Sequence, residues 1–136
     1  MGDSINLASR LEGANKFFKT NAMISGSTYE TVREKIEARR LDTVRVIGKK
    51  EAIPVYELLG RKGALPQRMY DMIEAYDRAL ALFQERQWKR ALGQFQAALE
   101  IITDDGPSLA YCTRCREYIK NPPPKTWDGV YSFKSK

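Results

Sequence analysis

A glycine- and proline-punctuated segment at residues 61–67 divides this sequence into two parts with different hydrophobic periodicity. Before it, helical spacing alternates with the period-two spacing that is typical of strands, whereas after it apolar residues recur at helical spacing only. A chain of 136 residues divided in this way has room for two small modules, each with a limited core. We therefore predict an α+β unit at residues 1–60, a linker at residues 61–67, an all-α unit at residues 68–121 and a proline-rich aromatic tail at residues 122–136.

The first unit is predicted to open with an amphipathic helix that Asp3 or Ser4 caps. Asn6 and Arg10 are four residues apart, so they share a polar stripe about 100° from the apolar stripe of this helix. An amide beside a guanidinium suits a phosphate or a sugar oxygen. Two polar residues on a solvated helix face fit the same spacing, so the pattern alone leaves both interpretations open.

The rest of the first unit is expected to form a strand, a helix and a hairpin. A short apolar run at residues 22–25 predicts a strand, and Ser27 or Thr28 is placed to cap the next helix, with Glu30 completing a capping box. Residues 41–59 switch to period two around a polar turn, which predicts a β-hairpin. One lone strand and a two-stranded ribbon are too little sheet to close a core, so we expect self-association or domain swapping.

Two stretches of this unit carry distinctive motifs. The string G-D-S-I-N-L-A-S-R-L-E-G-A-N-K at residues 2–16 is similar to a segment in the second half of the catalytic domain of class III adenylate and guanylate cyclases. L-D-T-V-R-V-I-G-K at residues 41–49, followed by P-V-Y-E-L at residues 54–58, is similar to that domain's closing strands. The resemblance implies that residues 1–60 are the C-terminal part of such a domain, with a partial ferredoxin-like arrangement of helix, strand, helix and β-hairpin.

The resemblance also implies a chemistry, in which ATP or GTP lies between two subunits or half-domains and becomes a cyclic nucleotide plus pyrophosphate. Asn6 would then orient the ribose, and Arg10 would stabilise charge on the phosphate oxygens during attack by the 3′-hydroxyl. Lys49 would bind the triphosphate. Because Ile47 replaces the first basic residue of the family's Lys-Gly-Lys pattern, Lys50 is an alternative, and both lysines also fit an ordinary solvated turn.

No metal ligand is expected within this chain. The resemblance implies that two aspartates in the first half of the domain hold two Mg²⁺ or Mn²⁺ ions, and Asp3 and Asp42 occupy other motif positions. The complete enzyme would be a phosphorus–oxygen lyase of cyclic-nucleotide signalling. Without the metal-binding half, we expect residues 1–136 to bind no cofactor and to make no cyclic nucleotide by themselves.

Composition narrows the classes of function. The formal net charge is +6, but Lys and Arg are interleaved with Asp and Glu, so we expect solvated helix faces and no nucleic-acid partner. The absence of histidine excludes Ser-His-Asp and Cys-His catalysis and histidine metal sites. No apolar run is long enough for a membrane span and no signal-peptide pattern opens the sequence, so we expect a cytoplasmic chain, which is compatible with a membrane anchor in a preceding region of a parent protein.

The second unit resembles one tetratricopeptide repeat followed by a capping helix. The small and aromatic positions of that repeat hold Ala79, Ala91, Phe95 and Ala98. Thr103 stands where the repeat usually has proline, a turn is expected at residues 85–87, and the third helix is expected to have Pro107 in its first turn. Cys112 and Cys115 share a face of this third helix, which favours buried, reduced thiols over a redox or shared-metal role.

The tail carries Trp127, Tyr131 and Phe133, which either dock on the helical unit or stay exposed to bind a peptide, docking being the interpretation we favour. Two hypotheses for the chain as a whole remain open. It is either the C-terminal part of a bacterial-type class III cyclase joined to a tetratricopeptide-like module, or a non-catalytic interaction protein that keeps the cyclase-derived unit as a scaffold for partner-binding helices.

Overall fold

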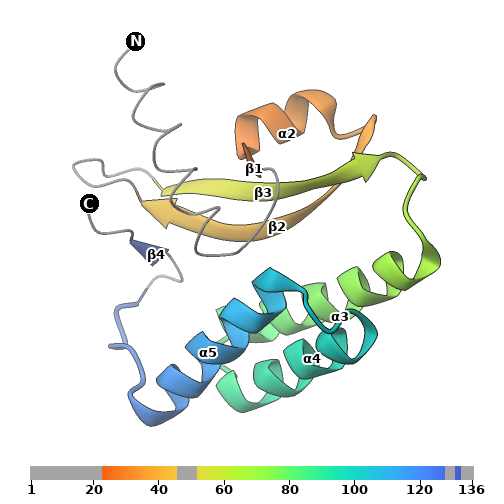
Figure 1. Ribbon diagram of the computed structural model, residues 1–136. Coiled ribbons are helices and arrows are strands. Elements are labelled where there is room, and N and C mark those ends of the chain that lie inside the picture. The colour runs from red at the N-terminus through yellow and green to blue at the C-terminus, as the bar shows by residue number, and fades with distance from the viewer. Residues whose placement is uncertain (1–22, 46–51, 128–130, 133–136) are drawn as a thin grey trace. The chain divides into compact units, whose positions relative to one another are not determined.

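The computed structural model describes residues 23–45, 52–127 and 131–132 (Figure 1). The chain divides into two compact units, one of residues 1–64 with 129–136 and the other of residues 65–128. The described residues of the first unit form β1 (Met23–Ser25), α2 (Gly26–Val32), β2 (Ile36–Arg45), β3 (Ala52–Arg61) and β4 (Tyr131–Ser132). Those of the second form α3 (Gln67–Gln84), α4 (Trp88–Ile101) and α5 (Gly106–Lys120). The predicted mixture of helices and strands is confirmed.

The strands of the first unit form one sheet in the order β1-β3-β2-β4. β1 and β2 both run antiparallel to β3, which confirms the predicted hairpin, and β4 pairs with β2 in parallel. The prediction of a lone strand was wrong, because Met23 to Ser25 pair with Glu57 to Val55 of β3. Joining the free edge of the hairpin gives the backbone groups of this short strand hydrogen-bond partners.

Helix α2 packs on the face of β3 that carries Tyr56. The rings of Tyr29 and Tyr56 are stacked, with centroids 4.1 Å apart and an interplanar angle of 11°. Gly26 lies so close to Pro54 that a Cβ atom at this position would be 2.6 Å from the proline Cγ. The cap differs from the predicted one, because the Ser25 hydroxyl accepts the Thr28 amide hydrogen bond at 3.3 Å.

Strand β2 begins earlier than the periodicity indicated, since the residues from Ile36 onward already pair with β3. Its register shifts twice, between Glu37 and Ala38 and again between Arg40 and Asp42. The second shift lets two consecutive residues, Leu41 and Asp42, both be buried. In a regular strand, consecutive residues point to opposite faces of the sheet. The bulge interrupts this alternation, so the period-two pattern does not reveal the full strand.

The three helices of the second unit follow the predicted order. Glu85, Arg86 and Gln87 separate α3 from α4, as expected from the sequence. α5 begins beside Pro107, and the Asp105 carboxylate caps it by accepting the Ser108 amide at 3.2 Å and the Ser108 hydroxyl at 2.6 Å. None of the helices in the described ranges combines the length and apolar character needed to cross a bilayer.

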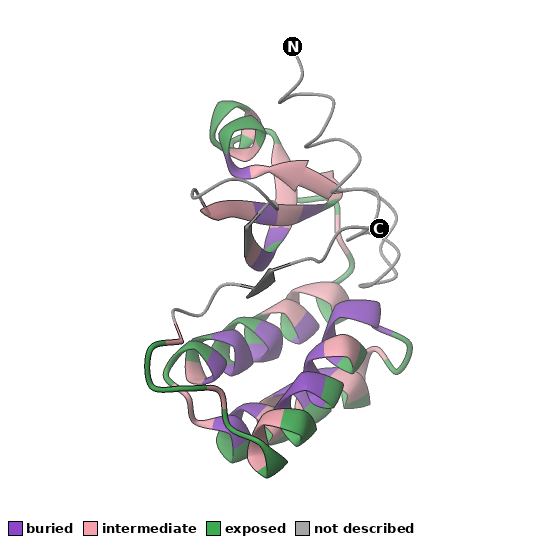
Figure 2. Ribbon diagram, turned by 90° about the vertical axis from the view of Figure 1, so that its left-hand side faces the viewer, coloured by how far each residue is buried: buried purple, intermediate pink, exposed green. Residues whose placement is uncertain are grey.

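The core of the helical unit combines aromatic rings with alanines, and Figure 2 shows its buried residues on the helix faces that meet inside the unit. The Phe95 ring is stacked on Tyr111 with centroids 5.0 Å apart, and Phe83 contacts the same tyrosine edge-on. The four repeat-like positions are all fully buried: Ala79, Ala91, Phe95 and Ala98. Small side chains at these positions let the backbones of neighbouring helices approach each other closely.

Candidate functional site

The residues that the sequence singled out for chemistry lie outside the described residues. Asn6 and Arg10 fall within residues 1–22, and Lys49 and Lys50 fall within residues 46–51. Their proposed contacts with a nucleotide therefore stay predictions. What the structure describes is the sheet that flanks the second of these segments, and the helical unit that follows.

The ends of β2 and β3 frame the lysine segment in sequence. Arg45, the last residue of β2, is paired with Ala52, the first residue of β3. Lys49 and Lys50 thus belong to the connection between two paired antiparallel strands. The pairing of the strands on either side of the two lysines is as predicted, and the lysines themselves lie outside the described residues.

An ion pair is buried within this hairpin. Arg39 of β2 lies directly opposite Glu57 of β3, and both Nε and Nη2 of the arginine are 2.8 Å from Oε1 of the glutamate. Only 4% of Arg39 and 7% of Glu57 is exposed. Each charge therefore depends on the other, because an ionised group taken out of water without a partner is costly.

Sequence reasoning missed this pair. Glu57 lies two residues from fully buried Val55, so both side chains point to the same face of β3, and this spacing was the available signal. Arg39 gave none, since it lies before the first residue of the predicted hairpin. The pair connects β2 to β3 and has a structural role in the sheet unit.

Asp42 is the other buried acid of the hairpin. Its Oδ1 accepts the Thr43 amide at 2.8 Å, and the Thr43 hydroxyl also accepts a hydrogen bond from Nη2 of Arg40. Because one register shift separates Arg40 from Asp42, the bulge itself is held by these local polar contacts. Within the described ranges, no three Cys, Asp or Glu side chains are grouped so that they would hold a metal ion.

The two cysteines of α5 are free and buried, as predicted. Burial, and to a smaller extent the neighbouring Cys112 thiol, raise the pKa of Cys115 to about 12. Burial likewise raises the pKa of Cys112. A thiol is nucleophilic and binds metals as the thiolate, so neither cysteine is suited to catalysis or redox exchange near neutral pH.

The start of the tail docks on the helical unit. The Trp127 ring packs edge-on against Phe83 and Trp88, with centroids 5.8 and 5.3 Å apart. Arg86, whose φ is +65°, donates hydrogen bonds to the carbonyl oxygens of Pro123 at 2.8 Å and Pro124 at 3.1 Å. Docking is therefore confirmed for Trp127, whereas the side chains of Tyr131 and Phe133 lie outside the description.

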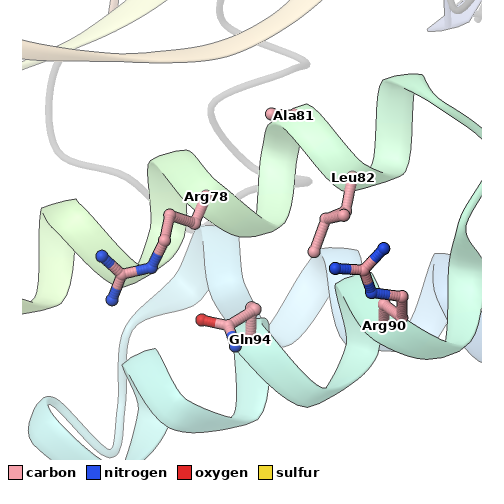
Figure 3. A pocket seen from close by; sticks show the side chains of 5 residues that line it. All are labelled: Arg78, Ala81, Leu82, Arg90 and Gln94. Carbon is pink, nitrogen blue, oxygen red and sulfur yellow. The ribbon is translucent and has the colours of Figure 1, made fainter.

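The helical unit also has a groove between α3 and α4. It encloses about 420 Å³ and is lined by Arg78, Ala81, Leu82, Arg90 and Gln94. Figure 3 shows the two guanidinium groups at opposite ends of this hollow, with Leu82 and Gln94 between them. We call these five residues the basic groove.

Comparison with known proteins relates the chain to adenylate cyclases. It is 32% identical over 124 residues to the terminal-differentiation-specific adenylate cyclase of Dictyostelium discoideum, a match that takes in 88% of this chain and 6% of that protein. It is 38% identical over 60 residues to adenylate cyclase 1 of Rhizobium meliloti (44% of this chain, 9% of that protein). It is 39% identical over 61 residues to the adenylate cyclase of Anabaena cylindrica (43% and 12%). No protein-family model and no solved structure matches it.

The extent of these matches carries information about the two units. The chain spans only 6% to 12% of the lengths of these relatives. A match over 88% of the chain does not fit within the sheet unit, so the Dictyostelium protein is similar to most of the helical unit as well. The two bacterial matches are short enough to lie within a single unit. The chain is thus similar in sequence to one adenylate cyclase, that of Dictyostelium discoideum, over both of its units.

Proposed function

We propose that this chain is the C-terminal part of a class III adenylate cyclase catalytic domain followed by a tetratricopeptide-like helical module. The observation that carries the proposal is the 32% identity to an adenylate cyclase over 88% of the chain. The cyclase-like string at residues 2–16 supports the same assignment. In the complete enzyme the reaction would convert ATP to cyclic AMP and pyrophosphate. GTP, as the substrate of a guanylate cyclase, is the alternative.

In this proposal Asn6 and Arg10 contact the nucleotide at an interface between two catalytic halves. The Asn6 amide would orient the ribose, so that its 3′-hydroxyl faces the α-phosphate. The Arg10 guanidinium would stabilise the charge that develops on the phosphate oxygens, which is the larger part of catalysis in phosphoryl chemistry. Lys49, with Lys50 as the alternative, would bind the triphosphate from the hairpin connection.

The metal ions of the reaction would be bound by the complementary half. The described residues offer no cluster of three possible ligands, and the sequence motif assigns none to Asp3 or Asp42. Bound metal would stabilise the leaving pyrophosphate and help to ionise the 3′-hydroxyl. We therefore propose that residues 1–136 by themselves are inactive, and that they need a half-domain with the metal-binding aspartates to complete a site.

Complementation tests this proposal. The purified chain would be mixed with a cyclase half-domain that retains the metal-binding aspartates but has the counterpart of Arg10 replaced, and cyclic AMP would be measured with ATP and Mn²⁺. We expect no product from either component alone and turnover from the mixture. Arg10→Ala should lower the restored activity by about 100-fold or more, because it removes a hydrogen-bond donor that stabilises charge in the transition state.

Two matched variants sharpen the assay. Ser9→Ala changes a neighbour of Arg10 in the same string and should keep the restored activity, whereas Asn6→Ala should lower kcat. Lys49→Ala and Lys50→Ala, compared side by side, identify the lysine that raises KM for ATP when lost. Turnover by the pure chain, or full restoration by Arg10→Ala, would contradict the assignment.

The alternative function is that of a non-catalytic interaction protein with a cyclase-derived scaffold. The specific observation in its favour is the basic groove, which lies entirely in the helical unit. A chain that binds a partner but never restores a complementary half-domain supports this alternative. Partner binding by the helical unit is also compatible with nucleotide chemistry in the sheet unit, since the two would use different units.

A further inference from the structure

The basic groove lies on the side of α3 that is turned away from α5. Tyr76, two residues before Arg78, contacts Tyr111 of α5 with ring centroids 6.2 Å apart. Residues two apart on an α-helix point about 200° apart, so Arg78 faces the opposite side. The apolar residues that line the groove are exposed Ala81 and half-buried Leu82.

Positive charge continues from the groove to the connection between α3 and α4 and the first turn of α4. Arg90 also lines a second hollow of about 360 Å³, whose walls include Arg86 and Lys89. Between Arg78 and Gln94 the sequence has four basic residues and one acidic residue, Glu85. This segment therefore presents a positive field to any partner that approaches α3 and α4 from this side.

The arginines at the two ends of the groove are weakly engaged within the unit. Arg78 is 3.7 Å from Glu74, and more than half of each side chain is exposed, so water screens this pair strongly. Arg90 donates a hydrogen bond to the amide oxygen of Gln87 at 2.6 Å, and this neutral acceptor does not balance the arginine's charge. Both guanidinium groups are able to donate a bidentate pair of hydrogen bonds to a carboxylate of a partner.

Gly93 gives a second, independent indication that a partner packs here. It lies in the interior of α4, is exposed, and a Cβ atom built on it would meet nothing within 4 Å. Glycine in a helix interior costs about 1 kcal/mol relative to alanine, and the described fold offers no contact that requires it. Gly93 is three residues from Arg90, on the same side of the helix, so its missing side chain leaves room for another backbone beside the groove.

We propose that the basic groove binds an acidic amphipathic helix of a partner protein. Carboxylates of that helix would pair with Arg78 and Arg90, its apolar residues would cover Ala81 and Leu82, and its backbone would approach Gly93. This is the helix-in-groove mode, with charge complementarity setting orientation and association rate. The inference goes beyond the proposed cyclase function, because it concerns the helical unit and does not depend on the chemistry of residues 1–60.

A nucleic acid fits this surface less well. Binding of single strands without sequence preference needs aromatic faces on which bases stack. Trp88 and Tyr118 line the second hollow beside Arg90, and the rings of both are already packed against Trp127. The groove itself is lined by no aromatic residue.

Fluorescence anisotropy with the full chain tests the proposal. The probe is a labelled 18-residue helical peptide with Glu on one face and Leu on the other. Arg78→Glu/Arg90→Glu should weaken its binding by at least about tenfold, since two charge pairs are reversed. Arg116→Glu/Lys120→Glu, an equal change of charge on α5, should alter binding less than twofold. Circular dichroism of both variants establishes that they are folded.

A charge swap and the glycine complete the test. A peptide with Lys in place of Glu should prefer Arg78→Glu/Arg90→Glu over the unmodified chain. Gly93→Trp should weaken binding of the Glu peptide, whereas Gly93→Ala should raise the melting temperature and leave binding within about threefold. Equal losses in the groove and α5 variants would overturn the proposal. Inorganic phosphate or a thymidine oligonucleotide that displaces the peptide with an affinity equal to the peptide's own would also overturn it. So would a second copy of the chain that occupies the groove.

Discussion

The two units are held together by different chemistry. The sheet unit depends on a buried ion pair, Arg39 with Glu57, set across a bulged hairpin. The helical unit depends on stacked aromatic rings and small residues, with its cysteines buried and neutral. An ion pair is sensitive to the loss of one partner, whereas an aromatic core distributes its packing over many contacts. We therefore expect single substitutions to lower the free energy of unfolding by clearly different amounts in the two units.

The largest expected effect is in the sheet unit. Arg39→Ala removes the guanidinium that pairs with the buried Glu57 carboxylate and should cost about 3–5 kcal/mol in the free energy of unfolding. Hydrogen exchange of β2 and β3 amides measures this loss. The double variant Arg39→Met/Glu57→Met removes both charges and should recover most of the protection. If the single and double variants lose equal protection, the pair does not stabilise the hairpin in the way described.

A smaller effect is expected where α2 meets β3. Gly26→Ala places a Cβ atom 2.6 Å from Pro54 Cγ, and the proline ring cannot rotate away. We expect about 1–3 kcal/mol of destabilisation, which is typical of overpacking. Pro54→Ala should relieve the clash in the double variant. Exchange of the β3 amides is again the measurement, and an unchanged rate in Gly26→Ala would contradict the close packing.

The matched change in the helical unit is at the α5 cap. Asp105→Ala removes the acceptor of the Ser108 amide and hydroxyl hydrogen bonds and should cost about 1 kcal/mol. Both tryptophans, Trp88 and Trp127, lie in this unit, so urea titration followed by tryptophan fluorescence reports it directly. Asp105→Asn, which keeps a capping oxygen, should lose less. A cost as large as that of Arg39→Ala would remove the contrast between the units.

The last expected effect is absent at neutral pH and concerns the titration of a buried thiol. The pKa of Cys115 is raised from 9.0 to about 12, so below pH 9 the folded and unfolded states both keep this proton. Between pH 9 and pH 12 the unfolded thiol ionises first, and the stability of the helical unit should therefore fall as pH rises. The slope in Cys115→Ala serves as the reference for other titrating groups. At pH 8 a thiol reagent should label the folded chain slowly and the urea-unfolded chain at once.

The comparison also explains what was predictable from the sequence. Ala79, Ala91, Phe95 and Ala98 were recognisable because a continuous helix repeats its buried face every 3.6 residues, and one turn at residues 85–87 does not disturb that pattern. The full length of β2 could not be predicted, because its two register shifts interrupt the regular alternation of side chains between the faces of the sheet. The pairing of β1 with β3 is a long-range choice, which local periodicity does not encode.

The candidate site shows the same division. Lys49 and Lys50 were correctly assigned to the connection of a hairpin, since two period-two runs on either side of a polar turn indicate it. Their ligand, and those of Asn6 and Arg10, rest on resemblance to a family and stay predictions. The Arg39–Glu57 pair was missed because each residue separately looks like a solvated charge, and only the register brings them together.

The central claim is that nucleotide chemistry belongs to the sheet unit and partner binding to the helical unit. One measurement compares the two directly: cyclic AMP formed by a complementary half-domain mixed with the unmodified chain, with Arg10→Ala, or with Arg78→Glu/Arg90→Glu. We predict that Arg10→Ala abolishes product, whereas the groove variant keeps the full rate. Loss of product in the groove variant together with normal product in Arg10→Ala would contradict the account.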